Sequence, residues 1–338
     1  MLVSALRATR LAAFCFLLTL CSGAFGFQQN GHGAADERVT IVPRVRPAAA
    51  PDSSELPRPD LRVDVPLVLI PVHVTTPLGT SVTNLNQEHF RLFEDDVEQE
   101  IKVFAKEDAP LSVGLLFDSS GSMRNKIRKA SEAAAAFFRT ANAEDEFFLI
   151  EFNERPKLAV PFTRDSDEIY RHIVRARPMG RTSLLDAIHL ALVQMKNASN
   201  LRKAIVIFSD GGDNRSRYTE AEIQSAMLES DVQLYAMGIF EAEDPRKLTP
   251  EERKGPRLLG ELADETGGRH FPVENLNDLP EVCARIGAEL RNQYLLAYCP
   301  TNGARDGKYR HVKVKLNAPE SMPPLRAHHR QGYFAPVQ

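Results

Sequence analysis

Between residues 111 and 292 the sequence alternates short apolar runs with amphipathic segments, and this alternation restricts the fold more than any other feature. Runs such as residues 111–118 and 145–152 are apolar at their centres, with their charged residues near the ends, as expected of strands that are buried on both faces. The segments between such runs carry apolar residues at helical spacing. Because repeated strand and helix units form a mainly parallel sheet with helices on both faces, residues 109–292 are predicted to form a doubly wound α/β domain.

The segments on either side of this domain have the pattern of β-strands. Residues 61–108 and residues 293–338 each hold too few strands for a core of their own, so we expect them to pair with each other. The α/β domain would then be an insertion in a small β-sandwich. Residues 27–60 are rich in Pro and Ala and lack periodicity, which is typical of a disordered linker.

Residues 1–26 have the parts of an export signal. Arg7 and Arg10 precede an apolar run over residues 11–20, and Ala24 and Gly26 fit the small-residue pattern of a cleavage site. The apolar run is much shorter than the ~20 residues that span a membrane, so a signal peptide is favoured over a membrane anchor. The protein is therefore expected to be exported and to be periplasmic, attached to the cell surface or secreted.

Composition argues against nucleic acid as a partner and limits the cysteine chemistry. The formal net charge is −3, whereas nucleic-acid binders present a basic surface. Removal of the signal peptide would also remove Cys15 and Cys21, which leaves Cys283 and Cys299. An exported protein meets oxidising conditions, and the sequence leaves open whether these two cysteines form a disulfide.

Five oxygen-bearing side chains are expected at one edge of the parallel sheet. Asp118, Ser120 and Ser122 follow one predicted strand, Asp210 ends another, and Thr182 lies at a helix start. Ligands bind at the carboxyl ends of such strands, where the strand order reverses, so we expect these residues to meet. Hydroxyl and carboxylate oxygens suit Mg²⁺ or Mn²⁺ better than Zn²⁺. Two aspartates balance a divalent charge, so the ion would still be able to accept a partner's carboxylate.

These motifs resemble the metal-ion-dependent adhesion site (MIDAS) of von Willebrand factor type A (VWFA) domains. The similarity rests on DSSGS at residues 118–122, the glycine and threonine at 180 and 182, and FSDG at 208–211. It implies a Rossmann-like α/β fold whose three hydroxyls bind the cation, while the two aspartates bind it directly or through water. The flanking segments also look like those of exported bacterial VWFA-related proteins. Arg181 stands where the family often has a small residue, which places a positive charge at the rim.

Structural roles compete with metal binding for some of these residues. Asp118 and Ser122 are good capping residues for the helix that is expected to begin near Met123. Asp186 fits the family pattern and also fits a simple acid at a helix start. Asp213 is interpreted as a turn residue. Agreement among three separate loops favours the metal site over capping alone.

Two further segments raise questions of their own. Residues 241–256 are long and charged for a connection between a strand and a helix, and the next helix is expected to begin at Pro256. The segment should lie at the same edge as the metal site, either as a surface that selects the partner or as a solvated loop. His328 and His329 are interpreted as a solvated strand end rather than as metal ligands.

An enzymatic function is disfavoured by the residues at the expected site. Ser120 or Ser122 would need a neighbouring base to act as a nucleophile, yet the three loops contain no histidine and the sequence has no GxSxG motif. The sequence therefore predicts a non-enzymatic protein that binds Mg²⁺ and, through it, an exposed Asp or Glu of a protein partner, with no small-molecule substrate. The alternatives are an envelope scaffold with incidental metal binding and, less favoured, a hydrolase.

Overall fold

The computed structural model describes residues 67–106, 109–240, 249–319 and 322–337. The predicted signal peptide and linker, residues 1–26 and 27–60, lie outside the described residues. None of the helices in the described ranges is both long enough and apolar enough to cross a membrane.

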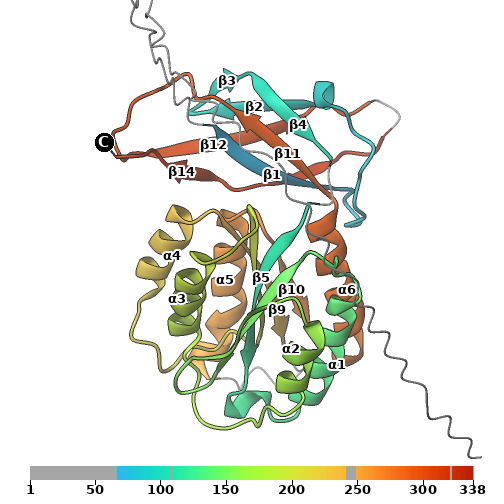
Figure 1. Ribbon diagram of the computed structural model, residues 1–338, viewed down its shortest axis with the longest axis vertical. Coiled ribbons are helices and arrows are strands. Elements are labelled where there is room, and N and C mark those ends of the chain that lie inside the picture. The colour runs from blue at the N-terminus through green and yellow to red at the C-terminus, as the bar shows by residue number, and fades with distance from the viewer. Residues whose placement is uncertain (1–66, 107–108, 241–248, 320–321, 338) are drawn as a thin grey trace, which may run out of the picture. The chain divides into compact units, whose positions relative to one another are not determined.

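A six-stranded sheet forms the centre of the larger part of the fold (Figure 1). Neighbouring strands are parallel except for β7, which pairs antiparallel with β6 at one edge. In spatial order the strands are β10 (His270–Val273), β9 (Val232–Ile239), β8 (Arg202–Ser209), β5 (Leu111–Asp118), β6 (Glu146–Phe152) and β7 (Lys157–Thr163).

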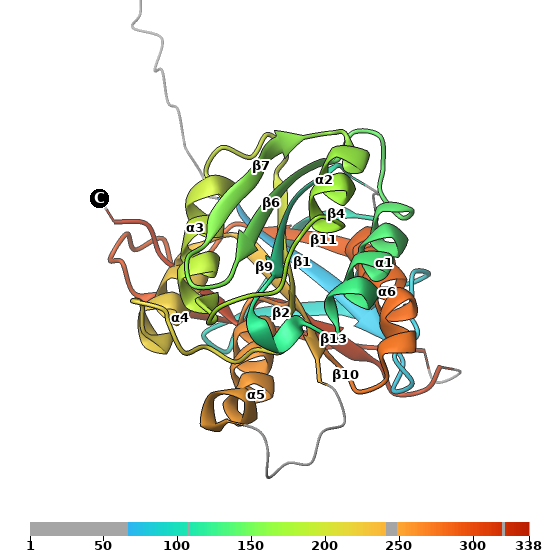
Figure 2. The ribbon, with the colours of Figure 1, turned by 90° about the horizontal axis from the view of Figure 1, so that it is seen from below.

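Helices cover both faces of this sheet, as Figure 2 shows, with α3, α4 and α5 on one side and α1, α2 and α6 on the other. The predicted doubly wound, Rossmann-like α/β class is therefore confirmed. The helices are α1 (Ile127–Phe138), α2 (Ser166–Ile173), α3 (Leu184–Met195), α4 (Glu220–Glu229), α5 (Pro250–Glu265) and α6 (Leu279–Arg291), and the 3-10 turns are η1 (Gln87–His89), η2 (Gly121–Met123) and η3 (Leu276–Asp278).

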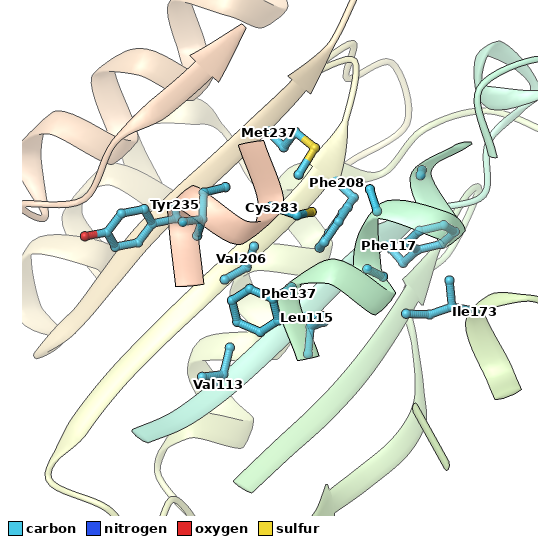
Figure 3. Packing of buried hydrophobic residues seen from close by; sticks show 14 of the residues in the cluster. Val113, Leu115, Phe117, Phe137, Ile173, Val206, Phe208, Tyr235, Met237 and Cys283 are labelled. Atoms are coloured by element: carbon cyan, nitrogen blue, oxygen red, sulfur yellow. The ribbon is translucent and has the colours of Figure 1, made fainter. Parts of the chain in front are cut away.

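The side chains of β5 alternate between two hydrophobic cores, because successive residues of a strand point to opposite faces. Leu115 and Phe117 pack into the core under α1 and α6 (Figure 3), whereas Leu116 faces the core under α3 and α5. Gly114 also faces that second side, where a Cβ atom would lie 2.3 Å from the ring of Phe148. The apolar run at residues 111–118 is thus a fully buried central strand, as its composition predicts.

Two helix boundaries differ from those expected from the sequence. The helix expected near Met123 begins at Ile127, because the backbone first makes the 3-10 turn η2. Helix α5 begins at Pro250 rather than at Pro256, which lies inside it. Thr249 explains the earlier start, since its side chain accepts from Glu252 N while the Glu252 carboxylate accepts from Thr249 N in a capping box. Residues 250–256 are therefore helical and do not extend the loop.

The flanking segments pair with each other in two four-stranded sheets around a third core. Strand β1 lies between β11 and β13, and β12 pairs with β2, so each sheet joins strands from both ends of the chain. The α/β domain is therefore inserted in a β-sandwich. In spatial order the sheets are β13 (Arg326–His328), β1 (Val68–Thr75), β11 (Gln293–Tyr298), β4 (Ile101–Ala105), and β14 (Gly332–Phe334), β12 (Tyr309–Leu316), β2 (Phe90–Glu94), β3 (Val97–Gln99).

The two cysteines of the described residues are free thiols. Cys283 is fully buried in the core beneath α6, and Cys299 is partly exposed just after β11. Burial also raises the pKa of the Cys283 thiol well above its ordinary value. Since thiolates are the reactive form, Cys283 is a core residue of low reactivity.

His73 of β1 and His329 just after β13 are buried and His328 is half-buried, which corrects the solvated strand end expected for His328 and His329. His329 is 7% exposed, and its Nε2 accepts a hydrogen bond from Val314 N at 3.1 Å. His328 Nε2 lies 3.1 Å from Thr75 Oγ1. The sequence hides this burial because it arises from strands far apart in the chain.

His73 is the most deeply buried of these histidines and faces charged groups from several elements. Its Nδ1 lies 3.4 Å from Glu289 Oε2, and neither atom has a hydrogen-bond partner among the described residues. Arg269 and Arg285 both donate to the other oxygen of Glu289. Burial, and then the charges of His328 and the arginines, lower the pKa of His73 to about 3. His73 is therefore neutral in the folded protein.

We expect the protein to lose stability as the pH falls below about 6.5, the ordinary histidine pKa. Below that value His73 is protonated in the unfolded chain but stays neutral in the folded protein. This difference lowers the free energy of unfolding by about 1.4 kcal/mol per pH unit, down to the pKa of His73 in the folded protein. The pKa of Glu289 is raised by burial, and this group acts in the opposite direction as the pH falls. Urea unfolding at several pH values should show the slope, and His73→Gln should reduce it. An unchanged slope in that variant would contradict the assignment.

Candidate metal centre

The strand order reverses between β5 and β8, and the candidate site lies at the carboxyl ends of these two strands. The chain runs from β5 outward to β6 and β7, and then returns to β8 on the other side of β5. Asp118 is the last residue of β5, and Asp210 directly follows β8. Figure 2 looks at this end of the domain, where the loops after the strands meet. This is the usual ligand position in a doubly wound sheet.

Asp118 is fully buried, and both of its carboxylate oxygens accept hydrogen bonds. Ser120 N donates to Oδ1 at 2.8 Å, and Ser209 Oγ donates to Oδ2 at 2.5 Å. Ser120 is also buried, and its hydroxyl lies 3.0 Å from the hydroxyl of the exposed Ser122. The first loop thus places a carboxylate and two hydroxyls in sequence from the interior to the surface.

Asp210 is 3% exposed and forms a buried ion pair that the sequence did not predict. Lys126, at the N-cap of α1, places Nζ 3.4 Å from Asp210 Oδ2. The other oxygen, Oδ1, accepts from Gly212 N at 3.3 Å. An ammonium group therefore already stands beside one of the two predicted aspartate ligands.

The loop that carries Thr182 is tied to both neighbouring loops through the backbone. Gly121 N donates to Gly180 O at 3.0 Å, which joins it to the loop after β5. Thr182 N donates to Asn214 Oδ1 at 3.0 Å, and Asn214 N donates to Thr182 O at 3.1 Å, which joins it to the loop after β8. The three loops that were expected to meet form one hydrogen-bonded unit.

The electrostatics of the site fit a cation. Burial and then the neighbouring Asp210 carboxylate raise the pKa of Asp118 to about 7, against the opposing effect of the Ser120 and Ser209 hydrogen bonds. Among the described residues Lys126 pairs with Asp210 and no ion pair reaches Asp118, so the charges of the two buried acids and the one ammonium do not balance. The surrounding donors are hydroxyl and carboxylate oxygens, the ligands that Mg²⁺ prefers. The chemistry of the residues therefore fits a hard divalent ion.

The other two acids near the site have structural roles. Asp213 accepts from Leu185 N at 2.9 Å and from Ser216 Oγ at 2.6 Å, so it fixes the loop after β8 to the start of α3. Asp186 accepts from Arg217 N and Tyr218 N at 2.8 and 3.2 Å. Asp213 is thus a turn residue as expected, and Asp186 is a satisfied acid in the first turn of α3.

Sequence reasoning missed Ser209 and Lys126, which contact Asp118 and Asp210. Ser209 is visible in the sequence as the hydroxyl directly before Asp210, but its position on an apolar strand suggests only core packing. Lys126 precedes an amphipathic helix, where a lysine ordinarily faces solvent. Only the turn η2 between β5 and α1 brings Lys126 back over the site.

Comparison with known proteins gives a family match over the central part of the chain. Residues 113–212 match the family described as the von Willebrand factor type A domain. An uncharacterised protein of Borreliella burgdorferi is 23% identical over 168 residues, which cover 46% of this chain and 49% of that protein. Inter-alpha-trypsin inhibitor heavy chain H2 of Mesocricetus auratus is 27% identical over 158 residues, covering 41% of this chain and 17% of that protein. The chain thus matches less than half the length of either relative.

Solved structures of low sequence identity are also similar. A von Willebrand factor type A protein of Catenulispora acidiphila has 13% identity and a TM-score of 0.47, with 71% of this chain and 75% of that chain covered. The conserved hypothetical protein BatB of Bacteroides thetaiotaomicron has 18% identity and a TM-score of 0.44, with 53% and 98% covered.

Proposed function

This chain contains a von Willebrand factor type A domain, and on that premise we propose that it is a non-enzymatic binding protein with a divalent cation at its site. The cation is Mg²⁺ or Mn²⁺, and a protein partner completes its coordination with an exposed Asp or Glu. The proposed ligands are Asp118, Ser120, Ser122, Thr182 and Asp210.

The observation that carries this proposal is the pair of buried aspartates at the edge of the sheet. Asp118 and Asp210 are 0% and 3% exposed, and among the described residues the ion pair at this site is that of Lys126 with Asp210. Burial of an unbalanced carboxylate is costly, and natural sites offset it by pairing or by metal coordination. A cation beside both aspartates would lower the free energy of the folded site.

The residues of the chain would hold the ion and leave one side of it open. When bound, the ion supplies a positive centre that accepts a carboxylate from outside. Asp118 and Ser120 lie on the inner side of the site, and Ser122 is exposed at the surface. The backbone hydrogen bonds between the three loops keep these donors in place before any partner arrives.

The contacts of the serines support a non-enzymatic role. Ser120 pairs with Ser122, and Ser209 donates to Asp118. Among the described residues, no histidine forms a hydrogen bond with any of these hydroxyls. An activated serine needs such a base within reach.

Asp118→Asn tests the metal site directly. We expect this variant to lose Mg²⁺ uptake in titration calorimetry, because it removes one of the two charges that balance the ion. The metal-free variant should be as stable as the parent or more stable, since it removes the repulsion between Asp118 and Asp210. Asp167→Asn, an exposed acid on α2, is the matched control. Equal Mg²⁺ uptake by the parent and Asp118→Asn, or no uptake by either, would contradict the proposal.

The alternative is an envelope scaffold that uses its surfaces and binds metal only incidentally. Capture of the native partner from an envelope extract in Mg²⁺ and in EDTA separates the two functions. EDTA should abolish capture if the ion completes the contact, and should leave it unchanged for a scaffold. We propose export as the setting for either function, with residues 1–26 as the signal peptide, residues 27–60 as a linker and the VWFA domain over residues 109–292.

A further inference from the structure

The loops that form the site carry a set of exposed arginines. Arg124 follows η2 in the loop after β5, Arg215 follows Asn214 in the loop after β8, and both are exposed. Arg177 and Arg181 are exposed in the loop between α2 and α3, on either side of Met179. We name these four residues the arginine rim. The chain as a whole has a net charge of −3, so this concentration of positive charge is local.

The positive charges of the arginine rim are not paired with carboxylates within the described part of the protein. Among the residues of the described ranges, none of the four guanidinium groups forms an ion pair with a carboxylate. By contrast, the neighbouring Arg217 pairs with Asp186 at 3.3 Å, and the carboxylate of Asp213 is occupied by loop hydrogen bonds. Within the described ranges Arg217 thus has a carboxylate partner, and the four rim arginines have none.

Besides Asp213, two further acids of the described ranges border the rim without forming an ion pair with it. Glu154 lies next to Gly180, where its Cγ would be 2.8 Å from an added Cβ atom. Glu252 lies next to Gly212, and its carboxylate accepts from Thr249 N at 2.7 Å in the capping box of α5. Neither acid forms an ion pair with a rim arginine in the described ranges. As far as the described residues go, the rim therefore keeps an excess of positive charge around the proposed metal position.

We propose that the partner presents an acidic segment to this site, in which the coordinating Asp or Glu is flanked by further carboxylates that contact Arg124, Arg177, Arg181 and Arg215. This inference rests on the proposed function for the central carboxylate. The contacts of the flanking carboxylates depend only on the rim arginines and not on the metal ion. Guanidinium groups pair with carboxylates in a planar, two-pronged geometry, which favours acidic side chains over isolated dipoles.

Met179 indicates that the partner is a protein rather than an acidic polysaccharide. Its side chain is 62% exposed between two rim arginines, and its backbone N donates to Ser119 O at 2.9 Å, which fixes the loop against the site. An exposed methionine close to exposed arginines fits a contact with another protein, because both residue types are enriched in protein interfaces. A sulfated or carboxylated polysaccharide offers much less apolar surface to cover it.

Fluorescence anisotropy with two labelled peptides tests the proposal. One peptide carries a single aspartate among neutral residues, and the other carries the same aspartate flanked by glutamates. In Mg²⁺ we expect the acidic peptide to bind the intact protein more tightly than the single-aspartate peptide. We expect the double variant Arg181→Gln, Arg215→Gln to bind the acidic peptide about tenfold more weakly, because each exposed arginine–carboxylate pair contributes about two- to fivefold. Arg326→Gln is the matched control, since Arg326 is exposed on β13 and has no ion pair in the described ranges.

The outcomes separate this inference from the metal proposal. If the intact protein takes up no Mg²⁺ but the acidic peptide still depends on the rim arginines in EDTA, the metal proposal fails and the rim proposal stands. If Mg²⁺ uptake is normal but the two peptides bind alike, or the double variant binds like the control, the rim proposal is wrong. Tighter binding of dextran sulfate than of the acidic peptide, unaffected by Met179→Ser, would also overturn it in favour of a polysaccharide.

Discussion

Lys126→Met is expected to destabilise the metal-free protein by about 3 kcal/mol, because it leaves the buried Asp210 carboxylate without its partner. Methionine keeps most of the length of the side chain but removes the charge. We expect the same variant to bind Mg²⁺ about tenfold more tightly, since the ion no longer competes with an ammonium group for Asp210. Urea unfolding in EDTA and calorimetric titration with Mg²⁺ measure the two effects.

Lys129→Met is the control for this prediction. Lys129 lies on the same helix, is 30% exposed and pairs with Glu132 at 3.3 Å, so its loss should change stability by less than about 1 kcal/mol. Saturating Mg²⁺ should restore much of the stability of Lys126→Met and little of that of the control. If both variants unfold alike in EDTA and bind Mg²⁺ with the affinity of the parent, Lys126 has no role in the charge balance of the site.

Gly255→Ala is expected to destabilise the protein by about 2–3 kcal/mol, although alanine is the better helix former. Gly255 lies inside α5, and its Cβ would be 2.6 Å from Asp210 O and 2.8 Å from the carbonyl carbon of Gly211. These atoms belong to the backbone and cannot rotate away. The loop that carries Asp210 would have to move, so we also expect weaker Mg²⁺ uptake.

Gly260→Ala on the same helix provides the opposite result. Its added Cβ would meet only His270 Nδ1, at the ordinary distance of 3.8 Å. Alanine should therefore stabilise α5 by about 0.5–1 kcal/mol at this position. Thermal unfolding of the two variants should shift in opposite directions. Equal shifts would show that Gly255 does not support the Asp210 loop.

Local sequence patterns predict the central domain well because its strands are buried on both faces. The run that ends at Asp118 has no other stable environment than the middle of a sheet, and the aspartate then falls at the edge where ligands bind. The order of the three loops follows from the same alternation of strands and helices. The residues proposed as metal ligands could therefore be named before their contacts were known.

The contacts that depend on irregular turns or on distant strands could not be predicted in this way. Lys126 reaches Asp210 only because η2 changes the direction of the chain, and a 3-10 turn has no clear periodic signal. His328 is half-buried because β13 pairs with β1, which is far away in the sequence. The start of α5 was predictable, since Thr249, Pro250 and Glu252 form a recognisable capping pattern.

The insertion of the α/β domain determines how a mechanical force on the site would be transmitted to the β-sandwich. The chain enters the domain after β4 and returns through β11, and these neighbouring strands pair at the same end through Ala105 and Leu295. A pull on a bound partner would therefore reach the sandwich through both strands at this one end. Because β11 is paired with β4 on one side and with β1 on the other, such a load would be shared by three strands rather than carried by one.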